Sequence, residues 1–151
     1  AVAVDERTLE HVSEFSEFVR PVRNPKLTDF CTVLTSITQG EVDQANAFPE
    51  VCHRVADWVD SFESHVVGSW GAFDRLQFRQ DCGHHQVPYP FKGRHRNLKE
   101  EFKDATGKVQ RCGMMSALRH YGLEAEGTQH RGIDDARNIA RIYQEIRSDY
   151  D

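Results

Sequence analysis

The sequence predicts a single α/β domain, and three observations carry that prediction. Apolar residues recur at helical spacing near the C-terminus, at Ile139, Ile142 and Ile146. Short apolar segments at residues 1–4 and 66–67 are typical of buried strands. Strand-like and helix-like segments alternate along 151 residues, a length that fits one domain with a real core.

The first quarter of the chain predicts two extended segments followed by short helices. Ala1–Val4 is expected to be a buried strand, and the polar residues Asp5–Arg7 a turn into an extended stretch from about His11 to Val19. Pro21–Pro25 is expected to be a turn-rich connector, and Leu27–Ile37 to form one or two short helices. Because the chain begins without Met and inside a strand-like segment, we expect further sequence upstream.

The middle of the chain predicts helix, strand and helix again. Pro49 is placed for a helix start, where its missing N–H costs nothing, and one apolar face follows at Val51, Val55, Trp58, Val59 and Phe62. His65–Trp70 is expected to contain a strand centred on 66–67, and a turn at Gly71 then leads to a helix beginning near Phe73. The segment Cys82–Gly93, rich in Gly, Pro and His, is expected to be a loop.

Three further segments complete the predicted α/β alternation. Asn97–Lys99 is expected to open a helix, and Met114–Tyr121 to form another that ends at Gly122. The C-terminal helix begins near Ile133. No apolar run reaches the length of a membrane span, and no signal peptide is visible.

Composition describes an ordinary globular protein with 38% hydrophobic and 28% charged residues. The net charge of −5 argues against a general electrostatic grip on nucleic acid. It does not exclude a nuclease, since carboxylates that bind metal ions add to the negative count and the ions reverse their local sign. The four scattered cysteines contain no Cys-x-x-Cys pair and predict free thiols in a reducing cytoplasm.

The segment His130–Ile142 is the most informative part of the chain. Continuing the isoleucine stripe toward the N-terminus places Asp135 on the core-facing side of the C-terminal helix, five residues after His130. Asp134 falls instead on a polar line with Arg137, Asn138 and Arg141, which we expect to face solvent. An acid at a helix start commonly caps free N–H groups, and that is our interpretation of Asp134. For Asp135, together with His130, the spacing favours a site.

Other polar residues have competing interpretations. Asp74 follows a strand and a glycine at a helix start, where ligands gather in open α/β sheets, but a capping or surface acid is an alternative. Cys82-Gly83-His84-His85 could suggest zinc, yet no second ligand pair is apparent and loop polarity explains it. The basic run Lys92–Lys99 is either a phosphate-contacting edge or a solvated face.

Several motifs in order make the chain resemble the DEDDh branch of the DnaQ-like 3′→5′ exonucleases, within the RNase H-like superfamily. It is most similar to the histone-mRNA and Eri-type RNA exonucleases and their bacterial sporulation-inhibitor relatives. The resemblance runs from Phe18 to the C-terminal helix. It rests on Asn24-Pro25-Lys26-Leu27, Leu34-Thr35-Ser36-Ile37-Thr38, Phe48-Pro49-Glu50-Val51, Ser69-Trp70-Gly71-Ala72-Phe73-Asp74, Arg96-Asn97-Leu98-Lys99 and Gly127-Thr128-Gln129-His130 with the helix that follows.

The resemblance implies a three-layer fold with a mixed central sheet, and hydrolysis that releases mononucleotides from a 3′ end, RNA being the expected substrate. Asp74 and Asp135 match acids that hold two divalent ions, Mg²⁺ or Mn²⁺, and His130 matches the general base. Asp134 keeps a capping or supporting role. Leu34 and Thr35 match the segment that packs against the terminal nucleotide, and Phe73 would help to wall the site.

One motif of the family is missing. Its first strand carries an Asp-x-Glu that supplies two further acids, and Asp5-Glu6 cannot replace it. We therefore expect residues 1–151 to be a single exonuclease domain that lacks its first strand and is inactive and poorly stable alone, within a cytoplasmic protein that is active when complete. The alternatives are a non-catalytic relative that binds nucleic acid or protein, and a DNA-directed proofreading-type exonuclease.

Overall fold

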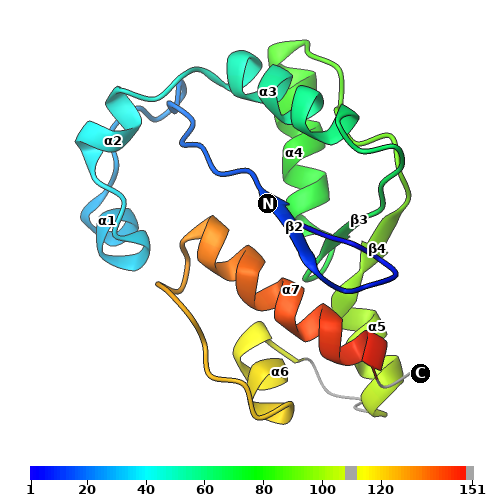
Figure 1. Ribbon diagram of the computed structural model, residues 1–151. Coiled ribbons are helices and arrows are strands. Elements are labelled where there is room, and N and C mark those ends of the chain that lie inside the picture. Colours follow the sequence, from blue (N-terminus) through cyan, green and yellow to red (C-terminus); the bar gives the residue numbers. More distant parts are fainter. Residues whose placement is uncertain (108–111, 149–151) are drawn as a thin grey trace.

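The computed structural model describes residues 1–107 and 112–148, and it has the predicted mixed α/β architecture (Figure 1). Strands are short and helices account for most of the regular structure. The elements in chain order are β1 Val2–Val4, β2 His11–Glu14, α1 Asp29–Thr35, α2 Gln39–Asp43, α3 Phe48–Asp60, β3 Val67–Ser69, α4 Phe73–His85, β4 His95–Asn97, α5 Leu98–Thr106, α6 Met114–His120 and α7 Gly132–Ser148.

The strands form two small sheets instead of the single mixed sheet that was expected. β1 and β2 are antiparallel, with Val2 opposite Glu14, and β3 and β4 are parallel, with Val67 opposite His95. Within the described residues each sheet has two strands, so β1 and β3 each have one paired edge. β3 and β4 run in the same direction because α4 connects them, and parallel neighbours need such a crossover connection.

The second extended stretch is shorter than predicted. β2 ends at Glu14, and the next residue, Phe15, donates its N–H to the carbonyl of Ala1, the residue that precedes β1. Val19 lies in an isolated parallel bridge with Asn46. The helix predicted within 27–37 is α1, which Thr28 caps by accepting a hydrogen bond from the N–H of Cys31.

The main core lies where α7 packs against α5 and α6. The predicted isoleucine stripe is confirmed, because Ile142 and Ile146 are fully buried against Phe102 and Leu118. Each such side chain contributes about 1.5–3 kcal/mol through removal from water. This cluster fixes the axis of α7 and therefore the direction in which its first turn projects.

A second packing unit joins α3 and α4. Val51, Val55 and Val59 form the buried face of α3, as the spacing predicted. The prediction of a loop from Cys82 was wrong, because α4 continues to His85 and ends at Gln86 in a left-handed conformation. Cys82 is buried beside Phe48 and Cys52, and this burial holds the last turn helical despite its glycine. None of the described helices is long and apolar enough to cross a membrane.

Candidate active site

Asp74 is presented by the turn between β3 and α4. β3 ends at Ser69, whose hydroxyl donates to the carbonyl of Gly71 at 2.7 Å, and Gly71 takes a φ of 111° that favours glycine. α4 then begins at Phe73, so Asp74 lies in its first turn and is exposed to solvent. Phe73 beside it is 73% exposed. The sequence-predicted position of Asp74, beyond a strand and at a helix start, is confirmed.

His95 stabilises this turn and was not singled out from the sequence. Its Nε2 lies 2.8 Å from the Ser69 hydroxyl oxygen, whose single hydrogen points to Gly71. His95 Nε2 must therefore be the donor, which defines the tautomer. Burial, reinforced by the nearby Arg75, lowers the pKa of His95, while the Asp74 carboxylate opposes that shift. A neutral imidazole therefore supports the turn that carries Asp74.

His130 and Asp135 meet at the start of α7. The backbone of His130 has a φ of 67°, a left-handed conformation that few residues other than glycine adopt. Its N–H donates to Asp135 Oδ1 at 3.4 Å, and the His130 side chain is in an exposed position. A left-handed non-glycine residue costs free energy that the surrounding contacts must offset, and such residues cluster at functional sites.

Asp135 and Asp74 interact electrostatically although they come from different helices. Burial raises the pKa of Asp135 above its usual range, and the negative charges of Asp134 and Asp74 raise it further. The backbone hydrogen bond from His130 opposes these effects. Two carboxylates that repel one another in this way are suited to share a cation. Asp135 therefore lies beside His130 and within electrostatic range of Asp74.

Asp134 supports the loop before α7 by contacts that reach beyond its own helix. Its carboxylate accepts from the N–H of Thr128 at 2.8 Å and from Arg137 at 3.0 Å. Gly127 lies so close that a Cβ there would be 2.3 Å from the Asp134 carboxyl carbon. The glycine is needed both for this approach and for its own φ of 72°.

The polar line of α7 was expected to face solvent, and for Asn138 this was wrong. Asn138 is 2% exposed, and its amide donates to the carbonyl of Glu126 at 2.8 Å and accepts from the N–H of Glu126 at 3.0 Å. Arg141 adds a bond to the carbonyl of Glu124 at 2.8 Å. The loop that ends in His130 thus folds over this side of α7 and buries it.

The residues expected to contact the terminal nucleotide lie on α1, on the other side of the His130 loop. Leu34 is 39% exposed, and Thr35 is half-buried and donates its hydroxyl to the carbonyl of Cys31. The side chain of Arg131 joins the two parts, because its Nε donates to the carbonyl of Thr35 at 3.2 Å. No role was predicted for Arg131 from the sequence, since its partners lie far upstream in the chain.

The carboxylate oxygens of Asp74 and Asp135 have the chemistry that Mg²⁺ or Mn²⁺ prefers. Within residues 1–107 and 112–148, however, no three His, Cys, Asp or Glu side chains gather closely enough to hold an ion. Asp74 and Asp135 therefore fit part of a metal site. Cys82 is buried beside Phe48 and Cys52, and the ring of His85 stacks on that of Phe48.

The basic run is a solvated face in part, because Lys92 and Arg94 are exposed, whereas Arg96 is largely covered. Lys92 pairs with Asp60 at 2.9 Å. Arg96 donates to Glu101 at 2.8 Å and lies over the ring of Tyr143, so its charge is paired within the fold. The free-thiol prediction is confirmed, and the fold brings two of the four cysteines, Cys52 and Cys82, close together.

Comparisons with known proteins identify the family of the chain. The Exonuclease family model (RNase_T) matches residues 1–143. Similar proteins include the probable 3′-5′ exonuclease KapD of Bacillus subtilis, 32% identical over 93% of this chain and 68% of that protein. Human 3′-5′ exoribonuclease 1 is 33% identical over 93% of this chain, but the match spans 43% of its length.

Solved structures show the same fold. The nuclease domain of 3′hExo, a DEDDh family member bound to rAMP, matches with a TM-score of 0.90 and 32% identity, covering 98% of this chain and 78% of that chain. A 3′-exonuclease structure that describes 3′-end-specific recognition of a histone mRNA stem-loop matches with a TM-score of 0.89 and 30% identity. It covers 98% of this chain and 69% of that one.

Proposed function

Because the chain belongs to the Exonuclease family, we propose that it serves as a 3′→5′ exonuclease domain that removes nucleotides singly from the end of RNA. The observation that carries the proposal is that Asp135 accepts the N–H of His130 at 3.4 Å and lies close enough to Asp74 on α4 for the two carboxylates to repel one another. Named relatives that act on RNA support RNA as the substrate class. The chain spans 43% of the human relative's length, so the substrate of a whole protein is part of this proposal.

DEDDh nucleases generally use divalent metal ions, and we assign Asp74 and Asp135 as ligands for Mg²⁺ or Mn²⁺. When bound, such ions neutralise charge on the scissile phosphate and lower the pKa of water. We assign His130 as the general base that would accept the proton of the attacking water, in keeping with its exposed position beside Asp135. Leu34, Thr35 and Phe73 would enclose the terminal nucleotide, and Asp134 would hold the loop.

Residues 1–151 contain no Asp-x-Glu sequence, so they supply two of the four acids that the family uses. We therefore expect this chain to leave RNA intact by itself. We expect activity when a segment carrying Asp-x-Glu is fused before Ala1, where it can pair with the open edge of β1 or β3. Shortening of RNA by the unfused chain would refute the need for those acids.

The deciding assay follows 5′-labelled single-stranded RNA and DNA with the fused protein and Mg²⁺ or Mn²⁺. We expect products that shorten singly from the 3′ end, with RNA degraded faster. His130→Ala should slow the reaction by about 10²–10⁴-fold, the range for general acid–base catalysis, whereas His53→Ala, an exposed histidine on α3, should not. Faster loss of DNA would favour the proofreading type, and binding without cleavage would favour a non-catalytic relative.

A further inference from the structure

The helices α1 and α2 form an arm, residues 28–44, which lies to one side of the helices that carry the core (Figure 1). None of the seven residues of α1 is buried, and Phe30 and Val33 are 72% and 86% exposed. In α2 the buried residue is Val42. With so little apolar burial, the position of the arm relative to α7 must depend strongly on polar contacts.

Arg131 supplies such contacts from the opposite side. Its Nη2 donates to the carbonyl of Ser36 at 2.8 Å, and its Nε donates to the carbonyl of Thr35 and the hydroxyl of Ser36. These groups terminate α1, where unpaired carbonyls and the helix dipole favour a cation. Ser36 has a left-handed φ of 55°, which turns the chain toward α2.

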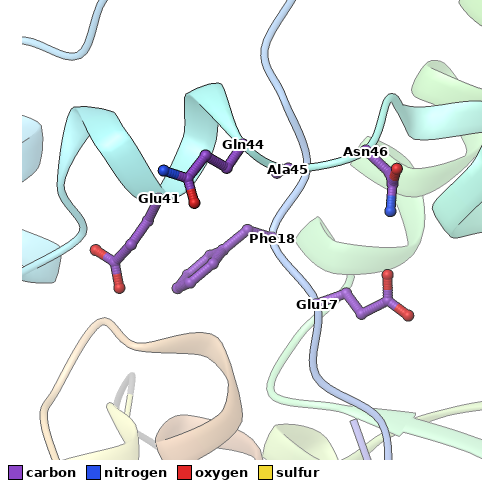
Figure 2. A pocket seen from close by; sticks show the side chains of 6 residues that line it. All are labelled: Glu17, Phe18, Glu41, Gln44, Ala45 and Asn46. Carbon is purple, nitrogen blue, oxygen red and sulfur yellow. The ribbon is translucent and has the colours of Figure 1, made fainter.

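The same guanidinium reaches the second helix of the arm. Its Nη2 lies 3.8 Å from Glu41, and its Cζ lies 5.8 Å from the centre of the Phe18 ring. Phe18 and Glu41 line a pocket of about 230 Å³, and Figure 2 shows both side chains directed to the same side of it. Arg131 therefore joins the end of α1, the start of α2 and the segment that contains Phe18.

The backbone of Arg131 is fixed at the start of α7. Its N–H donates to the carbonyl of Thr128, and its own carbonyl accepts the first helical hydrogen bond from Asp135. Arg131 follows His130 directly. The backbone of Arg131 thus holds the loop that presents His130. Its side chain holds α1, the helix that presents Leu34 and Thr35.

We propose that Arg131 is a positioning residue that latches the α1–α2 arm to the His130 loop, so that the nucleotide-binding wall and the general base keep a fixed separation. This inference rests on the proposed function for its purpose, but the latch itself is a property of the fold. Replacement by glutamine should release the arm without loosening the core, because the core lies between α5, α6 and α7.

Hydrogen exchange tests the latch without catalysis. In Arg131→Gln we expect amide exchange in residues 28–44 to rise about tenfold or more, as loss of charged hydrogen bonds implies, while exchange in α3 and the core of α7 stays unchanged. Arg131→Lys should restore part of the protection, since one ammonium can still bond the end of α1. Arg147→Gln, which removes the same charge from the last turn of α7, should change nothing in the arm.

A titration with adenosine 5′-monophosphate and Mg²⁺, followed by amide NMR signals, separates positioning from general stability. In the unaltered fused protein the signals of Thr35 and His130 should shift with one dissociation constant. In Arg131→Gln one dissociation constant still describes both signals, because a single nucleotide binds, but at saturation the shift of Thr35 should shrink at least threefold relative to that of His130, because the released arm no longer packs on the nucleotide.

Unchanged exchange in residues 28–44 would overturn the latch. Weaker nucleotide binding with unchanged exchange would also overturn it and make Arg131 a direct ligand of the phosphate. Failure of the nucleotide to bind the unaltered fused protein would count against the proposed function, while the exchange result would still decide whether the latch exists.

Discussion

Replacing Gly127 by alanine tests whether the close approach of this glycine to Asp134 holds the His130 loop in place. Gly127 has a φ of 72°, and an added Cβ would lie 2.3 Å from Cγ and 2.6 Å from Oδ2 of Asp134. The carboxylate must then move away from the N–H of Thr128, to which it is bonded at 2.8 Å. The substitution therefore combines backbone strain with the loss of a charged hydrogen bond.

The expected loss can be worked out from these two effects. A left-handed conformation costs an L-residue about 1–2 kcal/mol, and losing a hydrogen bond to a charged group costs about 1.5–3 kcal/mol. Gly127→Ala should therefore lower the free energy of unfolding by about 2.5–5 kcal/mol. Gly122→Ala is the matched control, because Gly122 has a φ of 68° and nothing within 4 Å of its added Cβ. Its loss should be about 1–2 kcal/mol.

Urea unfolding followed by circular dichroism measures both losses, and hydrogen exchange at Thr128 localises the effect. We expect the Thr128 amide to lose protection in Gly127→Ala and to keep it in Gly122→Ala. Equal losses of stability in the two variants would refute the reasoning, because the Asp134 contact would then contribute nothing.

Three further substitutions have defined outcomes. Asn138→Ala leaves both backbone groups of Glu126 without their buried partner, so urea unfolding should register a loss of about 2–3 kcal/mol. Ile142→Ala opens a cavity in a fully buried position and should cost about 2–5 kcal/mol in the same assay; a loss below 1 kcal/mol would contradict the assigned core. The hydrogen bonds from Arg137 lower the pKa of Glu14 from 4.5 to about 2, so this pair stabilises the fold above pH 4.5 and loses that effect as pH falls toward 2. Glu14→Gln should accordingly be less stable than the unaltered protein at pH 6 and nearly equal to it at pH 2, and a difference that does not change with pH would exclude the pair as the cause.

The regular periodicities predicted most of the helices. The apolar spacing of α3 and α7 identified their buried faces, since tertiary packing there agrees with local sequence. The end of α4 was missed because Gly83 and two histidines are typical of a loop, whereas burial of Cys82 overrides that local preference. The composition of a short segment does not indicate a packing partner 30 residues away, as Cys52 is from Cys82.

The candidate site was predicted in part for the same reason. Asp74, His130 and Asp135 stand at helix starts, where spacing along the sequence is informative. The burial of Asn138 and the contacts of Arg131 could not be predicted from local spacing. A loop that folds back buries Asn138, and Ser36, a partner of Arg131, lies 95 residues upstream. Charged and amide side chains on a helix are expected to face water unless a distant segment covers them.

The reactivity of the two thiols between α3 and α4 reports how often these helices separate. Cys52 and Cys82 are buried with their sulfur atoms 4.0 Å apart, and burial is the main cause that raises the pKa of Cys82 to about 12. Alkylating reagents attack the thiolate, so neither sulfur reacts near neutral pH while the helices remain packed. Half-buried Cys31 is accessible without that separation. The rate at which iodoacetamide modifies Cys52 and Cys82 relative to Cys31 therefore measures how often α3 and α4 part in the folded protein.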